Sequence, residues 1–258
     1  MTSSNQSLRT RITSAVCVAL EPLPSVLAAW EGGSAAFGAV DDYSDIDLNV
    51  LADDDVPLDV LYAVAEAALG AVSPITTSHV SPPGRYYKLK ESDDFLLVDL
   101  IILRAGASAQ ALEVERHGVP RCLFDKGDWL RPRPLDEDAL AARRDARRRE
   151  LDAWFVVSQS FVRKAVLRGQ EVEALASFWG YTLKPLVELL RMQYCPARWD
   201  FGMRYLDRDL PPAAYSQLRD LMFVRDLAGI EAHLPRASAW GAALLRDLDL
   251  PVRQRDAD

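Results

Sequence analysis

The stretch that most constrains the fold of this chain is GGSAAFGAVDDYSDIDLNVL, residues 32–51. A Gly-Ser pair, Gly33-Ser34, is followed by two carboxylates one residue apart, Asp45 and Asp47, inside an apolar run. If that run is a strand, side chains two residues apart point to the same face, so the two carboxylates stand side by side while their neighbours enter a core. Such like charges repel unless a positive group lies between them. A divalent cation fits that place, and a solvated acidic surface is the alternative.

A third carboxylate lies in a similar setting. Residues 95–103 read FLLVDLIIL, an apolar run in which Asp99 is the single charged residue. Its length and branched side chains favour a buried strand over a helix. An unpaired ionised carboxylate is costly there, so Asp99 is either a structural acid with a buried partner or a further metal ligand. We expect Asp99 to complete a site with the two earlier acids.

These three features occur together in one known superfamily. Gly33-Ser34, the triplet Asp45-Ile46-Asp47 and the later Val98-Asp99-Leu100 follow one another at suitable spacing. In that respect the chain resembles the DNA polymerase β-type nucleotidyltransferases over the part that contains these motifs. An acidic triplet alone arises often by chance, but the three parts in order are more specific. The C-terminal half is also similar, more vaguely, to the helical domain of antibiotic-modifying members.

The resemblance implies a magnesium-dependent transfer of a nucleoside monophosphate from an NTP, with ATP as the first choice, to a hydroxyl group. Asp45 and Asp47 would bind two Mg²⁺ ions, and Asp99 would bind one of them and accept the hydroxyl proton. One ion would activate the attacking hydroxyl and the other would offset charge on the departing pyrophosphate. Gly33 would let the backbone approach phosphate closely, and Ser34 would donate its hydroxyl there.

The chain departs from many relatives just after the Gly-Ser turn. They carry an Arg or Thr there, whereas this chain has Ala35-Ala36-Phe37. Charge on the triphosphate must therefore be met from elsewhere. Lys184, in SFWGYTLKPLVELLR, is the first candidate because antibiotic-modifying relatives use a helical lysine, and Lys88, in RYYKLK, is the second. An ordinary surface lysine is the alternative for Lys184.

The two halves of the chain differ in charge. Residues 1–130 contain 9 Lys and Arg against 19 Asp and Glu, and residues 131–258 contain 21 against 19. The acidic half attracts metal ions and cationic acceptors, and the balance argues against a long RNA or DNA partner. We expect a small hydroxyl-bearing acceptor, such as the aminoglycoside- or lincosamide-type antibiotics that the resemblance suggests. A protein or tRNA acceptor, as in toxin–antitoxin relatives, and a nucleotide-binding module without turnover are the alternatives.

The pattern of elements predicts an α/β (α+β) nucleotidyltransferase domain with a mixed sheet, residues 1–130, and an all-α domain, residues 131–258. The proline-rich stretch 131–134 marks the boundary. The expected strands are 25–31, 45–52, 75–80, 85–90, 95–103 and 120–125. The expected helices are 6–20, 57–69, a long one from the N-cap Asp136 to about 168, one near 171–194 kinked by Pro185, 212–227 and 230–247.

Two charged stretches of the second half have competing interpretations. The run ARRDARRRELD, residues 142–152, favours a solvated helix face over a nucleic-acid contact. The segment 198–212 is rich in aromatic and charged residues, which favours aromatic core with surface ion pairs over the lining of an acceptor pocket.

The remaining composition narrows the setting. Cys17, Cys122 and Cys195 match no zinc or redox spacing, which is typical of free thiols in a reducing cytoplasm. No apolar run approaches the roughly 18 residues of a membrane span, so we expect no contact with a membrane.

Overall fold

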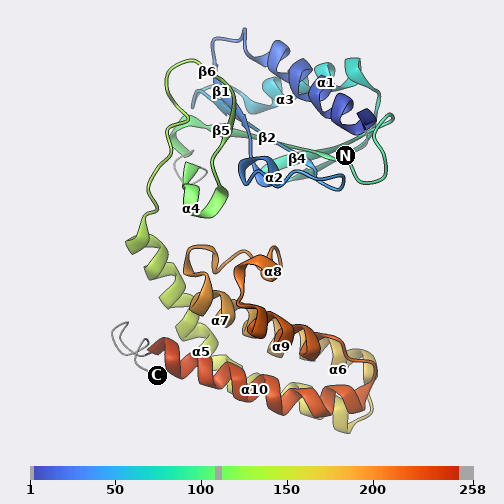
Figure 1. The fold of residues 1–258 in the computed structure, drawn as a ribbon, viewed down its shortest axis with the longest axis vertical. Coiled ribbons are helices and arrows are strands. Elements are labelled where there is room, and N and C mark those ends of the chain that lie inside the picture. The colour runs from blue at the N-terminus through green and yellow to red at the C-terminus, as the bar shows by residue number, and fades with distance from the viewer. Residues whose placement is uncertain (1–2, 108–111, 250–258) are drawn as a thin grey trace. The chain divides into compact units, whose positions relative to one another are not determined.

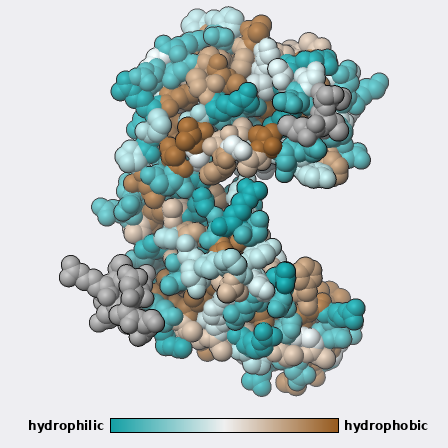
Figure 2. All heavy atoms as spheres, viewed as in Figure 1, coloured by the Kyte–Doolittle hydropathy of each residue, from teal (hydrophilic) through white to brown (hydrophobic). Residues whose placement is uncertain are grey.

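The computed structural model describes residues 3–107 and 112–249. The chain divides into two compact units, Met1–Leu135 and Asp136–Asp258 (Figure 1). Each unit has its own hydrophobic core. The proline-rich stretch 131–134 lies just before this division. Hydrophilic and hydrophobic residues are interspersed over the surface that is visible in Figure 2. Within the described residues, no helix combines the length and apolar composition that crossing a bilayer requires.

The first unit is built on a six-stranded mixed sheet with the order β3-β4-β5-β2-β1-β6. Only β2 and β5 are parallel among its neighbouring pairs in the described residues, and the others are antiparallel. Every strand expected from the sequence is present, with its ends shifted by at most a few residues. The strands are β1 (Val26–Glu31), β2 (Ile46–Ala52), β3 (Ile75–Ser81), β4 (Gly84–Leu89), β5 (Val98–Arg104) and β6 (Arg121–Asp125).

Helices α1 (Ser3–Leu20) and α3 (Leu58–Val72) cover one face of this sheet (Figure 1). Alternate residues of β2 and β5 enter the core beneath them, because successive side chains of a strand point to opposite faces. That core includes Leu8, Ile12, Val16, Ile46, Leu48, Val50, Leu61, Leu69, Val98, Leu100 and Ile102. The opposite face carries a smaller apolar cluster around Trp30 and Leu51. The short helices α2 (Gly33–Ala36) and α4 (Val114–His117) complete the unit.

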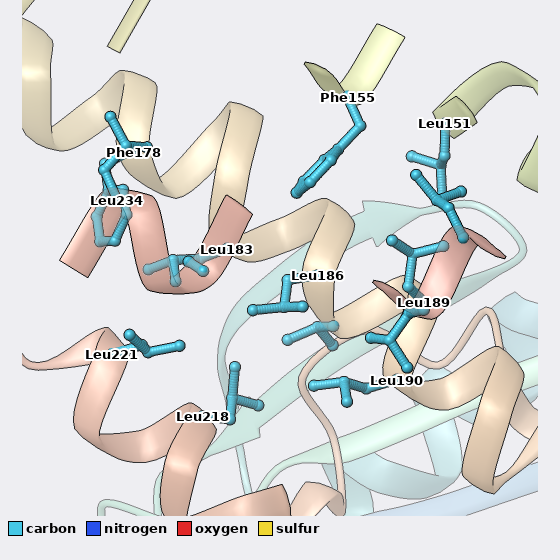
Figure 3. Close-up of a cluster of buried hydrophobic side chains, with 14 of the residues drawn as sticks. Leu151, Phe155, Phe178, Leu183, Leu186, Leu189, Leu190, Leu218, Leu221 and Leu234 are labelled. Carbon is cyan, nitrogen blue, oxygen red and sulfur yellow. The ribbon is translucent and has the colours of Figure 1, made fainter. Parts of the chain in front are cut away.

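The described residues of the second unit form helices and no strand. They comprise α5 (Glu137–Leu167), α6 (Glu171–Ser177), a π-helical turn (Phe178–Leu183), α7 (Lys184–Tyr194), α8 (Leu206–Asp209), α9 (Pro212–Met222) and α10 (Leu227–Asp249). Asp136 is the N-cap of α5, as expected, and its carboxylate accepts the Ala139 N–H at 2.9 Å. Phe155, Leu186, Leu218 and Leu234 of four different helices meet in the core (Figure 3).

The helix expected over 171–194 is interrupted by a π-helical turn just before Pro185, where we expected a kink. Proline has no N–H, so the Tyr181 carbonyl loses the donor that an α-helix would supply. The Gln159 side-chain amide of α5 replaces that donor at 3.0 Å, and Thr182 donates to the same side chain at 2.6 Å. A buried glutamine therefore satisfies the backbone group that the proline leaves unpaired, and fastens the π-turn to α5.

The segment 198–212 packs on the helical core, as the favoured interpretation predicted. Asp207 and Arg208 form an exposed ion pair in this segment, and Asp209 forms a buried one with Arg191. Trp199 and Met203 pack against the core. The side chain of Arg191 has no exposed area, and it donates to the Asp209 carboxylate at 2.7 Å. The Asp209 side chain is itself only 2% exposed. Arg191 also donates to the carbonyl groups of Arg198 and Gly202. The charge is tolerated in the interior because the carboxylate and the carbonyl oxygens together satisfy its donors.

The arginine-rich stretch 142–152 forms a charged face of α5. Arg147 donates to Glu188 at 2.7 Å and to Glu150 at 2.8 Å. Arg144 lies 3.5 Å from Asp145. These pairings are typical of a solvated helix face with interleaved charges.

Candidate active site

The Gly-Ser turn lies directly against the strand that carries the acidic triplet. The Gly32 N–H donates to the Asp47 carbonyl at 2.8 Å, which ties the turn to β2. Gly33 adopts φ +49°, and a Cβ atom at this position would overlap the carboxylate of Asp47. The Ser34 N–H also donates to that carboxylate. The turn therefore needs glycine both for its left-handed backbone and for its close approach to Asp47.

A row of polar side chains crosses three neighbouring strands. Asp47 of β2 pairs in register with Asp99 of β5, and Asp99 pairs with Tyr86 of β4. Register partners share a face, so Asp47 and Asp99 both lie on the face opposite the core residues Ile46 and Val98. The Tyr86 hydroxyl donates to the Asp99 carboxylate. Neighbouring strands are about 4.8 Å apart, a spacing that a cation held between two carboxylates can bridge.

Asp45 lies one residue before β2, although we expected it within the strand. Its position is fixed from the neighbouring connection, because its carboxylate accepts the Leu97 N–H and the next residue, Ile46, donates to the Leu97 carbonyl at 2.9 Å. The rings of Tyr43 and Phe95 meet edge to face with centroids 5.1 Å apart. The segments that lead into β2 and β5 are thus joined at several points.

The three carboxylates disturb one another electrostatically. The pKa of Asp47 is raised to about 6 by burial, the largest cause, and by the charges of Asp99 and Asp45, against the opposing effects of Arg9 and the Ser34 N–H. Burial also raises the pKa of Asp99, with a contribution from Asp45 and an opposing hydrogen bond from Tyr86. Burial raises the pKa of Asp45 as well. Each group is therefore harder to ionise than a solvated aspartate.

The donor set fits a hard divalent cation in its chemistry and charge, although the side chains are not closed around one point. Within residues 3–107 and 112–249, no three His, Cys, Asp or Glu side chains are gathered closely enough to hold a metal ion as they stand. The mutual repulsion of three carboxylates is what a bound cation would relieve. The Ser34 hydroxyl oxygen beside them is buried and has no hydrogen-bond partner. A ligand at the turn would supply one.

The two candidate lysines have different surroundings. Lys88 of β4 donates to the carbonyl groups of Asp93 and Leu96, and its charge lowers the pKa of Asp45. Its amine therefore braces the connection before β5. Lys184 is exposed at the start of α7, in the second unit.

Two residues near the carboxylates were missed by the sequence analysis. Tyr86 donates to Asp99 and is 36% exposed. Arg9 of α1 is 8% exposed, and its charge acts on Asp45 and Asp47. The sequence could have indicated Tyr86, because it occupies an outward position of β4, the strand that pairs with β5. Arg9 has none, because it contacts backbone groups 35 and 36 residues away.

The chain is similar to known proteins in its structure. No family model matches the chain, and no curated protein matches it. Nine solved chains match, among them the crystal structure of spectinomycin adenyltransferase AAD(9) from Enterococcus faecialis with ATP and spectinomycin. That match covers 95% of this chain and 99% of the other, at 11% sequence identity and a TM-score of 0.42. Similarity at this level does not establish a shared activity, which has to be inferred from this chain's own residues.

Proposed function

We propose that this chain is a magnesium-dependent nucleotidyltransferase that moves a nucleoside monophosphate, AMP as the first choice, from an NTP to a hydroxyl group of a small acceptor. The observation that carries the proposal is the register pairing of Asp47 with Asp99, beside a Gly-Ser turn that packs against the Asp47 carboxylate. The Gly-Ser turn, the acidic triplet and the later aspartate are the three motifs on which the resemblance to the nucleotidyltransferase superfamily is based, and they lie on neighbouring elements.

The reaction assigns a role to each group. Asp45, Asp47 and Asp99 would hold Mg²⁺, which neutralises charge on the triphosphate and the departing pyrophosphate. The acceptor oxygen forms a bond to the α-phosphorus while the bond from that phosphorus to the bridging oxygen breaks, and pyrophosphate leaves with the electron pair. Asp99 would accept the hydroxyl proton as this bond forms, which completes the proton balance of the step. The Ser34 hydroxyl and the N–H groups of the turn would contact phosphate oxygens.

The decisive experiment is transfer from NTPs labelled at the α-phosphate, with Mg²⁺ and a panel of hydroxyl-bearing acceptors that includes aminoglycosides and lincosamides. Label on a small molecule supports the proposal. Label on protein or tRNA in a cell lysate would keep the chemistry and replace the acceptor. Magnesium-dependent NTP binding without pyrophosphate release in every acceptor screen would instead indicate a nucleotide-binding module.

Asp99→Asn should reduce transfer at least about 100-fold, because it removes both a metal ligand and the proton acceptor. Initial rates at saturating ATP measure the loss. Asp94→Asn is the matched control, since Asp94 is an exposed acid in the connection that precedes the same strand. Equal rates for Asp99→Asn and the wild type would show that Asp99 has no part in the reaction.

Lys184→Met should raise the KM for ATP about tenfold, the equivalent of about 1.4 kcal/mol of lost binding. We assign the triphosphate contact to Lys184 because the amine of Lys88 is engaged by backbone carbonyl groups. Steady-state rates over a range of ATP concentrations test this, with Lys164→Met as the control at another exposed lysine. A raised KM in Lys88→Met, with Lys184→Met unchanged, would reverse the assignment.

A further inference from the structure

Arg9 reaches from α1 to the backbone at the start of the acidic strand. Its Nη1 donates to the Ser44 carbonyl at 2.6 Å, and its Nη2 donates to the Asp45 carbonyl at 3.0 Å. One guanidinium thus bonds to two successive carbonyl groups. This is the planar fork that arginine provides and lysine does not.

The two carbonyl groups that Arg9 binds, those of Ser44 and Asp45, lie just before β2 and outside the sheet. Residues 37–45 connect α2 to β2 through two turns, and in the second turn the Asp41 carboxylate accepts the Tyr43 N–H at 3.0 Å. On one side, Asp45 is fixed by Leu97. On the other side, the Arg9 guanidinium donates to the peptide group before the Asp45 Cα atom and to the peptide group after it. The direction of the Asp45 side chain therefore depends on Arg9.

The charges around Arg9 come from three elements. Burial lowers the pKa of Arg9, with a contribution from Arg121 of β6, whereas Glu31 of β1, then Asp47 and Asp45, act in the opposite direction. Glu31 is itself buried and forms an ion pair with Arg121. The arginine therefore lies between a paired structural carboxylate and two site carboxylates. Removing its charge would leave those buried acids less compensated.

We propose that Arg9 is a positioning residue that sets the Asp45 carboxylate for cation binding by holding the carbonyl groups of Ser44 and Asp45. This role rests on the proposed function of the carboxylates. Arg9 acts through the backbone and does not itself touch the substrate. Its effect comes from the geometry of the fork as well as from its charge.

Arg9→Lys separates these two contributions, because lysine keeps the charge and loses the fork. We expect Arg9→Lys to weaken Mn²⁺ binding by about 10- to 100-fold, the usual result when a group that orients a metal ligand is removed. Titration followed by electron paramagnetic resonance of free Mn²⁺ measures the affinity without any transfer reaction. Arg11→Lys is the matched control, since Arg11 is on the same helix and donates to Glu91 and to the Val72 carbonyl, away from the site.

Hydrogen exchange in metal-free protein gives a second readout. Arg9→Lys should speed exchange at the amides of residues 44–46, while the amides of β6 remain as slow as in Arg11→Lys. Wild-type Mn²⁺ affinity and wild-type exchange in Arg9→Lys would overturn the role of Arg9 alone. Absence of Mn²⁺ binding by the wild-type protein would remove the proposed function, and the positioning role with it.

Discussion

Asp47→Asn should abolish transfer, with a loss of at least about 1,000-fold, and should at the same time make the metal-free protein more stable at pH 7. The catalytic loss follows because an amide cannot replace the charge that holds a cation, and several kcal/mol of transition-state stabilisation correspond to factors of this size. The stability gain follows because Asn relieves the repulsion from Asp99 and Asp45 while its oxygen still accepts the Ser34 N–H.

The pH dependence fixes the sign of the stability effect. In the folded protein, burial and the neighbouring acids raise the pKa of Asp47 from 3.8 to about 6. Between these two values the folded state binds more protons than the unfolded state, so the stability of the metal-free wild type falls as the pH rises from about 4 to 6 and stays lower above that range. The carboxylate then costs about 3 kcal/mol at pH 7. Asp47→Asn should lack this part of the pH dependence.

Thermal unfolding in EDTA and in Mg²⁺, at pH 5 and pH 7, tests both statements. In EDTA at pH 7 the variant should melt several degrees above the wild type. Mg²⁺ should raise the melting temperature of the wild type and leave that of the variant unchanged. Asp53→Asn is the control, since Asp53 is an exposed acid just after the same strand. A variant that melts below the wild type in EDTA would show that the acids do not strain each other.

The strands of the first unit could be predicted because each buries alternate residues over a short apolar run. The alternation placed Asp47 on the outward side of its strand, and the isolated charge in FLLVDLIIL placed Asp99 on another. Their pairing could be expected only through the superfamily resemblance. The helix α3 and the hairpin of β3 and β4 separate β2 from β5 in the chain, and no local pattern indicates that these strands are neighbours or in which register they pair.

Several contacts that the sequence did not predict end on backbone oxygens. Arg9 binds the carbonyl groups of residues 44 and 45, and buried Arg191 binds those of residues 198 and 202. Every residue carries such an acceptor, so no residue type marks the partner. The sequence likewise did not indicate that the Lys88 amine donates to backbone carbonyl groups, so Lys88 remained a candidate for binding phosphate. A basic residue in isolation therefore gives weak information about its role.

The sequence predicted that glycine is needed at position 33 because phosphate approaches the backbone closely. The structure adds a second requirement, which does not involve the nucleotide. The position is left-handed, and the missing Cβ makes room for the Asp47 carboxylate. Alanine at this position has to displace the carboxylate or distort the turn. The glycine thus acts on the reaction through the placement of a metal ligand as well as through access to the nucleotide.

Gly33→Ala should therefore reduce transfer at least about 100-fold, since a displacement of about 1 Å at a reacting site has effects of this size. It should also abolish the stabilisation by Mg²⁺. Gly38→Ala is a sharp control, because Gly38 has φ +63° and no atom lies within 4 Å of an added Cβ. Both variants should lose about 1 kcal/mol from the left-handed backbone, but Gly38→Ala should keep full activity. Rates and unfolding curves for the pair separate crowding of Asp47 from backbone strain, and equal activity of the two variants would contradict the proposed contact.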